Sequence, residues 1–294
     1  MSENKNGILL VNKSINWTSN DVIRKLKSEF MVKKIGHAGT LDPLAKGVLP
    51  ILINSATKYF DYFLNLNKIY IAEITFGFST DTFDLEGEIV DKTNKIPSDI
   101  AEILEKLNSF KGKINQKPPI YSALKKRGKK LYEYARNNQS VEIEERKVFV
   151  QDINVINWDS PKLTLSIECS SGFYVRSFAN DLGIHLNSFA VLSNLERVKY
   201  GEFSINDYIE IEKKISLEKN IISLDNLFVN NPSLVLNEND EERYYLGNTF
   251  QNEIFTKNLL KSESVKIYNK SERFMGLLIY DFEKEFWKPK NIIR

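Results

Sequence analysis

Residues 36–50 read Gly-His-Ala-Gly-Thr-Leu-Asp-Pro-Leu-Ala-Lys-Gly-Val-Leu-Pro, and Asp42 is the only carboxylate within them. It is also the only acid between Glu29 and Asp61. Basic side chains surround it in the sequence: Lys33, Lys34, His37, Lys46 and Lys58. Neighbouring cations favour an ionised carboxyl group, and glycine and proline favour a fixed, unusual backbone. Asp42 is therefore a candidate for a charged functional group. The alternative is a loop aspartate that bonds its own backbone.

Hydrophobic spacing outside this loop predicts both strands and helices. Apolar or alternating residues at 7–11, 69–76 and 162–169 predict strands, because successive side chains of a strand point to opposite faces. Apolar residues at helical spacing predict helices after Thr18, over residues 98–110 and after residue 175. These elements are interspersed without a regular βαβ period, which favours the α+β class.

An Asn-rich stretch near residues 229–239 contains a proline and marks a candidate domain boundary. We expect a catalytic domain over residues 1–230 and a small module over residues 235–294. Within the tail, residues 265–268 and 274–280 have strand-like patterns.

Composition restricts the classes of protein and of site. The chain has 294 residues, a net charge of +2, one cysteine (Cys169) and two histidines (His37 and His185). A single cysteine excludes an intrachain disulfide, and so few ligand side chains disfavour a zinc site. We see neither a signal peptide nor an apolar run of the ~20 residues that cross a bilayer, so we expect a cytoplasmic location without a membrane.

Positive charge is concentrated in one segment. Residues 111–136 hold nine Lys or Arg residues and one acid, Glu133. A basic patch on an otherwise acidic chain is typical of polyanion binding, although a solvated lysine surface has the same composition. We expect an exposed loop here that continues into a short helix at residues 131–136.

The loop at residues 36–43, Gly-His-Ala-Gly-Thr-Leu-Asp-Pro, closely resembles the catalytic motif of the TruB family, the bacterial tRNA pseudouridine-55 synthases. Further stretches resemble the same family in the same order. They are residues 7–10 with Lys13, 68–70, 77–87, 116–125, 132–136, 169–183 and 195–203. The resemblance covers roughly residues 7–205, and the tail is similar to a PUA-like RNA-binding module.

This resemblance implies a pseudouridine-synthase-like fold, with a mixed, largely antiparallel central sheet flanked by helices and a small β-rich C-terminal PUA-like module. It implies isomerisation of uridine 55 in the T-loop (TψC arm) of tRNA, in which the glycosidic bond moves from N1 to C5 of uracil. No cofactor and no metal are expected. The expected partner is the tRNA T-arm, bound by a monomer without an obligatory protein partner.

The resemblance also assigns roles to three candidate catalytic residues. Asp42 is the expected nucleophile, and the first site of attack, sugar C1′ or uracil C6, stays open beside deprotonation routes. Arg176 is expected to pair with Asp42 and to keep it ionised and oriented. Tyr70 is expected to stack on the uracil. It could also take a proton, but an ordinary phenol with a pKa of ~10 is a poor base at neutral pH.

Three further residues are candidates for substrate binding. Tyr174 and Leu195 resemble pocket residues around the base, and ordinary core packing is the alternative for both. His37 is expected to enter the RNA loop and hold it open, since aromatic rings replace lost base stacking. The chain departs from the family pattern at Ser14, Phe173 and Glu196, which puts backbone shape and RNA contacts in doubt rather than the chemistry.

Three other functions remain open at this stage. A tRNA-folding chaperone would bind the RNA without modifying it, although the set Asp42, Tyr70 and Arg176 argues against pure binding. A guide-RNA-dependent pseudouridine synthase would work inside a multi-protein particle. An aspartyl-phosphate hydrolase is disfavoured, because Asp42 is followed by Pro-Leu-Ala without a second acid or a phosphate-binding glycine loop.

Overall fold

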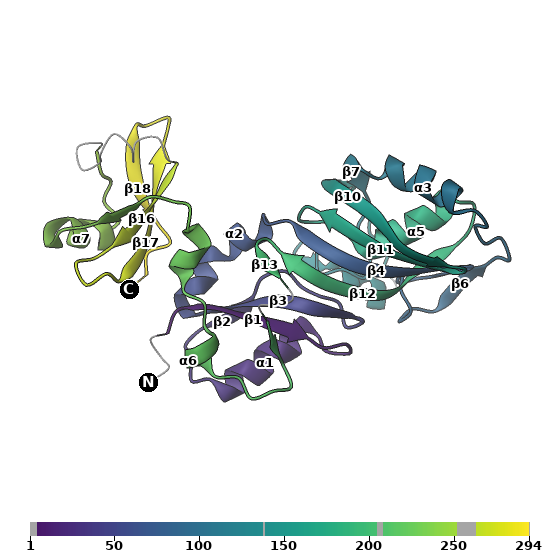
Figure 1. Cartoon of the computed structure of the whole chain (residues 1–294), viewed down its shortest axis with the longest axis horizontal. Helices are drawn as coiled ribbons and strands as arrows, with labels where there is room; N and C mark the ends of the chain where they lie inside the picture. The colour runs from purple at the N-terminus through teal and green to yellow at the C-terminus, as the bar shows by residue number, and fades with distance from the viewer. Residues whose placement is uncertain (1–4, 138, 205–207, 252–262, 294) are drawn as a thin grey trace.

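The computed structural model describes residues 5–137, 139–204, 208–251 and 263–293, and most of them surround one large sheet (Figure 1). The sheet order is β14-β1-β3-β12-β4-β11-β10-β7, with β2 paired to β3 and β13 to β12. These strands are β1 (Gly7–Lys13), β2 (Ile35–His37), β3 (Ala45–Ile53), β4 (Lys68–Phe76), β7 (Gly112–Gln116), β10 (Arg146–Asp159), β11 (Lys162–Cys169), β12 (Ala190–Tyr200), β13 (Phe203–Ser204) and β14 (Ile209–Glu210). Among the described strands of this large sheet, the pairs β1–β14 and β3–β12 are parallel and the others are antiparallel. The prediction of an α+β fold with a mixed, largely antiparallel sheet is confirmed.

Different helices pack on the two halves of this sheet. They are α1 (Ser19–Glu29), α2 (Phe60–Leu64), α3 (Ile100–Ser109), α4 (Leu131–Arg136), α5 (Val175–His185) and α6 (Leu217–Asn220), with 3₁₀ turns η1 (Asn54–Tyr59) and η3 (Leu224–Phe228). Helix α1 begins at a capping box in which Thr18 and Asp21 exchange hydrogen bonds. Its apolar side packs Val22 and Leu26 against β1 and β3. None of the helices among the described residues is long and apolar enough to cross a membrane.

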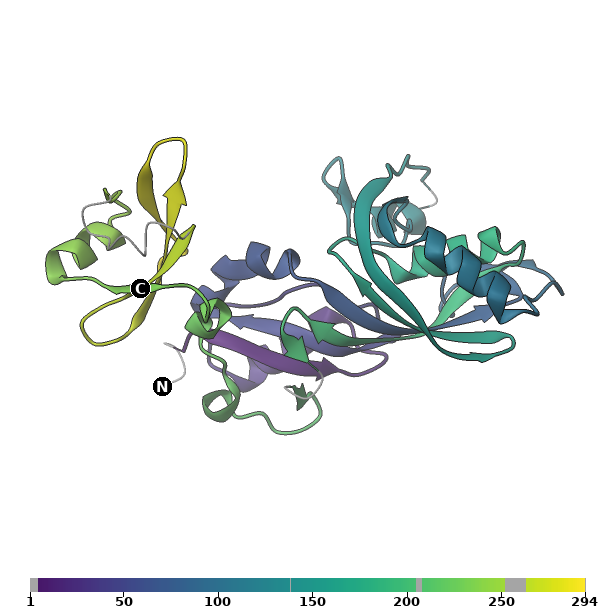
Figure 2. The same cartoon turned by 45° about the horizontal axis from the view of Figure 1, so that its top comes forward.

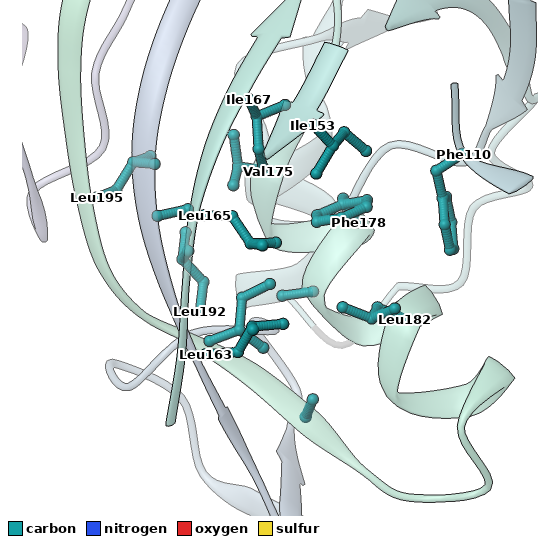
Figure 3. Packing of buried hydrophobic residues seen from close by; sticks show 14 of the residues in the cluster. Phe110, Ile153, Leu163, Leu165, Ile167, Val175, Phe178, Leu182, Leu192 and Leu195 are labelled. Atoms are coloured by element: carbon teal, nitrogen blue, oxygen red, sulfur yellow. The ribbon is translucent and has the colours of Figure 1, made fainter. Parts of the chain in front are cut away.

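The main core lies between α5 and the half of the sheet made by β4, β10, β11 and β12 (Figure 3). Alternation along β11 directs Leu163, Leu165 and Ile167 to this core, where Phe178 and Leu182 of α5 meet them. Residue 176 is offset by about 100° around the helix from Val175, because an α-helix has 3.6 residues per turn. Packing of α5 thus presents Arg176 at the margin of the core.

A second, smaller sheet lies at one end of the molecule (Figure 2). It has the order β15-β16-β17-β18 and contains β15 (Ser233–Val235), β16 (Ser264–Tyr268), β17 (Phe274–Asp281) and β18 (Phe286–Lys290), with α7 (Glu238–Tyr245) beside it. Its own apolar cluster is centred on Tyr244, Phe250 and Trp287. Leu277 of β17 and Ile293, which follows β18, instead join a cluster of the large sheet, so the two sheets share an apolar contact.

Two hairpins project from the large sheet. One pairs β5 (Phe78–Thr80) with β6 (Ile89–Lys92), and the other pairs β8 (Lys125–Lys126) with β9 (Lys129–Lys130). The turn of the second hairpin places Arg127 and Gly128 at positive φ, which suits a two-residue hairpin loop. The segment 111–136 is therefore partly ordered by a hairpin that runs into α4, and the expected short helix at residues 131–136 is present.

Candidate active site

The loop that carries Asp42 is held on both sides of that residue. Before it, the Ser19 hydroxyl accepts from the Leu41 amide at 2.9 Å and donates to the Leu41 carbonyl at 3.1 Å. After it, the carbonyl of Pro43 accepts from the backbone amide of Asn16 at 2.8 Å. The side chain of Asp42 remains 35% exposed. The protein thus fixes the backbone around the carboxylate while leaving the carboxylate accessible.

Lys13 supports the same loop through hydrogen bonds to backbone carbonyls. Its ammonium donates to the carbonyls of Trp17 at 2.6 Å, Ser14 at 3.0 Å and Pro43 at 3.5 Å, and the residue is 0% exposed. Burial lowers the pKa of this ammonium to about 8, although the charge of Asp42 works in the opposite direction. These contacts give Lys13 a role in supporting the loop.

The lowered pKa of Lys13 predicts a pH dependence of stability. Between pH 8 and the ordinary lysine value of about 10.4, the folded chain binds fewer protons at Lys13 than the unfolded chain. The free energy of unfolding should therefore rise with pH in this window, by about 1.4 kcal/mol per pH unit at most. Urea unfolding of the wild type and of Lys13→Met at pH 7.5, 9 and 10 measures the difference in slope. Lys95→Met, at an exposed position, is the control, and equal slopes for wild type and Lys13→Met would contradict the assignment.

One guanidinium joins three distant segments at the site. Arg176 places Nε 2.9 Å from Oδ2 of Asp42 and Nη1 3.5 Å from Oδ2 of Asp84. It also donates to the carbonyls of Thr82 at 3.3 Å and Tyr121 at 2.9 Å. Its side chain is only 6% exposed, so these contacts are shielded from water. The predicted pairing of Arg176 with Asp42 is present in the geometry.

Asp84 is the second carboxylate that Arg176 contacts, and it is buried. It is 1% exposed, and its Oδ1 accepts from the Thr82 hydroxyl at 2.6 Å and from the Glu86 amide at 3.0 Å. Burial raises the pKa of Asp84, while the Thr82 hydroxyl and the Arg176 charge oppose that rise. Sequence reasoning gave Asp84 no role. The Thr-Asp-Thr-x-Asp pattern at residues 80–84 was the available signal, since its hydroxyl could hold a buried carboxylate.

Contacts in the described residues leave one oxygen of Asp42 available. Arg176 engages Oδ2, and none of the residues that the structure describes donates a hydrogen bond to Oδ1. A carboxylate oriented through one oxygen by a buried cation can present the other oxygen to a bound molecule. Nor do the described residues contain a group of three or more His, Cys, Asp or Glu side chains positioned to hold a metal ion.

Tyr70 lies opposite a second buried arginine. In the pairing of β4 with β12, Tyr70 faces Arg197, which is 1% exposed. Arg197 donates to the carbonyls of Val48 at 2.7 Å and Gly39 at 3.0 Å, so it also holds the Asp42 loop. Burial raises the pKa of Tyr70, and the charge of Arg197 only partly offsets this. The Tyr70 side chain is thus a neutral phenol at physiological pH, which suits stacking better than proton abstraction.

The other predicted binding residues lie around the same loop. Leu195 is 6% exposed and pairs with Ala45 of β3, directly after the loop. The backbone of Tyr174 exchanges hydrogen bonds with the Gln116 side chain, at 2.8 Å and 3.0 Å, just before α5. His37 ends β2 in a half-buried position, and burial followed by the nearby Arg197 charge lowers its pKa. A neutral imidazole suits the expected stacking role.

The basic segment is anchored directly to the site. Gln116 binds the residue before α5, the Ser177 hydroxyl donates to the Lys117 carbonyl at 2.8 Å, and Arg176 donates to the Tyr121 carbonyl. Sequence reasoning missed Gln116 as a positioning residue. Hydrogen bonds therefore connect residues 111–136 to the Arg176 guanidinium, which orients Asp42.

The three departures from the family pattern each make a local contact. The Ser14 hydroxyl donates to the Glu212 carboxylate. Phe173 is 8% exposed and belongs to the main core. Glu196 lies 3.3 Å from the Lys46 ammonium, which follows the Asp42 loop.

Solved structures with the same architecture share the fold but little sequence. An H/ACA ribonucleoprotein bound to a substrate RNA containing 2′-deoxyuridine has a chain that matches with a TM-score of 0.70 at 18% identity, covering 98% of this chain and 85% of that one. A Cbf5-Nop10-Gar1 complex matches with a TM-score of 0.63 at 20% identity, covering 93% and 78%. This chain therefore has the same fold as those two chains.

Sequence comparisons identify the class of protein to which this chain belongs. The family model described as "TruB family pseudouridylate synthase (N terminal domain)" matches residues 27–175. The tRNA pseudouridine synthase B of Clostridium kluyveri is 37% identical over 92% of this chain and 94% of its own length. That of Ureaplasma urealyticum is 49% identical over 74% of this chain and 96% of its own length. The chain belongs to the TruB family of pseudouridylate synthases.

Proposed function

We propose that this protein isomerises uridine 55 in the T-loop of tRNA to pseudouridine, with Asp42 as the nucleophile. The observation that carries the proposal is the Asp42 carboxylate, accessible to a ligand yet held at 2.9 Å by the buried Arg176. The relatives named tRNA pseudouridine synthase B support tRNA as the substrate. The T-arm, the single-chain mode of action and a cytoplasmic location are parts of the proposal.

The reaction conserves atoms, because the bond from C1′ to N1 breaks and a bond from C1′ to C5 forms. The proton leaves C5 and N1 gains one, so no redox change or hydrolysis occurs. Asp42 acts either by attacking the nucleotide or by stabilising the separated base and sugar. In either route the target base must leave its stack to reach the carboxylate.

The aromatic residues would hold the flipped base. Tyr70 would stack on uracil as a neutral phenol, because burial raises its pKa. Tyr174 and Leu195 would line the pocket beside the loop, and His37 would occupy the space that the flipped base leaves in the RNA. Each of these rings replaces stacking that the RNA loses on opening.

Residues 111–136 would bind phosphates of the T-arm. Lys125 and Lys129 on the β8–β9 hairpin are exposed, whereas Lys126 lies 3.2 Å from the Glu144 carboxylate and Lys130 lies over the Tyr132 ring. The two exposed lysines are thus better placed for phosphate than the two engaged ones.

Reversing the charge of the hairpin lysines, Lys125, Lys126, Lys129 and Lys130, to Glu is expected to weaken tRNA binding and to flatten its salt dependence. For every lysine that no longer meets a phosphate, the log–log salt slope should fall by about one. Filter binding at several salt concentrations measures both quantities. Unchanged affinity at low salt would exclude this segment from RNA binding.

We further propose two functional domains. The catalytic domain would comprise residues 1–230, and residues 235–294 would form a PUA-like RNA-binding module. The small sheet supports this division through its own apolar cluster, and its strand β15 starts at Ser233, slightly before the proposed module.

Purified protein incubated with an unmodified tRNA transcript, followed by mapping of pseudouridine, tests the proposal. Pseudouridine at position 55 alone is expected, without added guide RNA or protein. Binding without any pseudouridine would favour the chaperone, and activity only after addition of a guide RNA and further proteins would favour the guide-dependent class.

A further inference from the structure

A groove runs between the large sheet and the small C-terminal sheet, apart from Asp42. It encloses about 730 Å³. Basic side chains come from both sheets or the turns beside them: Lys33 and Lys34 precede β2, Lys58 lies in η1, and Arg273 precedes β17. Polar side chains, including Asn6 and Ser55, complete the lining.

The charge in this groove is of one sign. Among the residues that the structure describes, no Asp or Glu lines it. Two acids are next to lining residues in the sequence, although neither lines the groove itself. Asp225 follows Leu224, and its Oδ2 accepts from the Tyr268 hydroxyl at 3.0 Å while its Oδ1 is buried. Glu272 precedes Arg273 and is exposed. Lys33, Lys34 and Arg273 are exposed, and none of them forms an ion pair with an acid in the part of the chain that the structure describes.

The two walls of the groove are held in a defined relation. Ile293 from the C-terminal end packs with Tyr59 and Leu224 in one apolar cluster, and Phe274 lies against it. The Tyr59 hydroxyl lies 3.4 Å from the Asn291 carbonyl, and the Lys58 ammonium donates to the carbonyl of the next residue, Ile292. Cations on opposite walls therefore present a preformed surface instead of independent flexible chains.

The groove and the catalytic loop lie along the same strand. Lys34 precedes β2, and His37 ends it, so two residues lie between the groove and the residue expected in the RNA loop, a Cα separation of about 10 Å. The basic segment 111–136 instead reaches the site from the other side, through the contacts of Arg176 and Gln116. The groove is thus a second cationic surface, separate from that segment.

We propose that this groove binds the phosphate backbone of the substrate tRNA outside the T-arm hairpin. The inference rests on the proposed function. An open groove with cations spread over two walls fits a chain of phosphates better than one small anion, because each cation can meet a different phosphate. A tRNA whose T-loop is held at Asp42 must extend away from that site. Lys33 and Lys34, just before β2, place positive charge between that site and the rest of the groove.

The test compares two ligands and two variants. The ligands are a full-length tRNA transcript and an isolated T-arm hairpin of the same sequence. The groove variant is Lys33→Gln, Lys34→Gln, Arg273→Gln. The control variant, with the same charge change, is Lys95→Gln, Lys106→Gln, Lys214→Gln, at positions outside the groove, the segment 111–136 and the proposed C-terminal module. Binding is measured over a range of salt concentrations, and pseudouridine formation is measured on both ligands.

The groove variant should bind full-length tRNA about tenfold more weakly, with a log–log salt slope shallower by up to about three, one for each cation that meets a phosphate. Its affinity for the hairpin and its rate on the hairpin should equal those of the wild type. Equal losses on both ligands, no loss on either, or the same loss in the control variant would each overturn the proposal. A wild type that makes no pseudouridine on either ligand would refute the proposed function instead, while the binding comparison would still decide the groove.

Discussion

Asp42→Asn is expected to reduce pseudouridine formation by about 10⁴-fold or more, the range seen when a nucleophile is removed from an enzyme. The tRNA affinity should stay within about threefold of the wild type, because the substitution removes one charge from a surface whose cations supply the binding. Asparagine has nearly the same shape, and its carbonyl oxygen can still accept from the Arg176 guanidinium, which now contacts Asp42 at 2.9 Å.

Single-turnover rates with excess enzyme and equilibrium binding to the same transcript separate these two effects. Asp61→Asn is the matched control, since Asp61 is an exposed aspartate in α2, and it should behave as the wild type. A variant Asp42→Asn that turns over at the wild-type rate would remove Asp42 from the chemistry. Loss of binding in parallel with activity would instead make Asp42 a binding residue.

Arg176→Met has the second large effect, and it acts on stability as well as on activity. Arg176 is the partner of two carboxylates, and Asp84 is 1% exposed. Removing the cation leaves the Asp84 charge buried, which costs about 3–5 kcal/mol of unfolding free energy. The loss should be smaller at acidic pH, because burial raises the pKa of Asp84 and the protonated form carries no charge to bury.

A double variant distinguishes the two roles of Arg176. Arg176→Met with Asp84→Asn removes the buried charge together with its partner, so much of the lost unfolding free energy should return. Activity should not return, since Asp42 still lacks the guanidinium that orients it. Urea unfolding and single-turnover rates measure the two outcomes. Recovery of activity in the double variant would show that Arg176 acts only through the fold.

The local elements were largely readable from the sequence. The strands at residues 69–76 and 162–169, the helix after Thr18 and the helix at residues 131–136 all form as predicted, because their apolar spacing or capping residues act over short range. The α3 helix also forms, but Leu104, one of its apolar residues at helical spacing, is 46% exposed. Helical spacing defines a broad apolar side, whereas only tertiary packing decides which of its residues are covered.

Other elements escaped prediction for identifiable reasons. The glycines and prolines of region 36–50 predict a loop, yet β3 begins at Ala45 and continues through Gly47 and Pro50. Both residues usually interrupt strands. Here Gly47 has a φ of 112° and lies so close to Arg197 that any Cβ would meet its carbonyl oxygen at 2.3 Å. The glycine reflects a close approach of two strands, which one segment of sequence does not reveal.

The sequence by itself determined the family, the loop with Asp42 and the identity of its partner Arg176, because these depend on residue types in a fixed order. Only the tertiary structure decided that one guanidinium bridges Asp42 and the buried Asp84, and that Arg197 faces Tyr70. The physical reason is that both contacts depend on sheet register and on the packing of α5 over the core. Burial and charge pairing arise there between segments that are far apart in the chain.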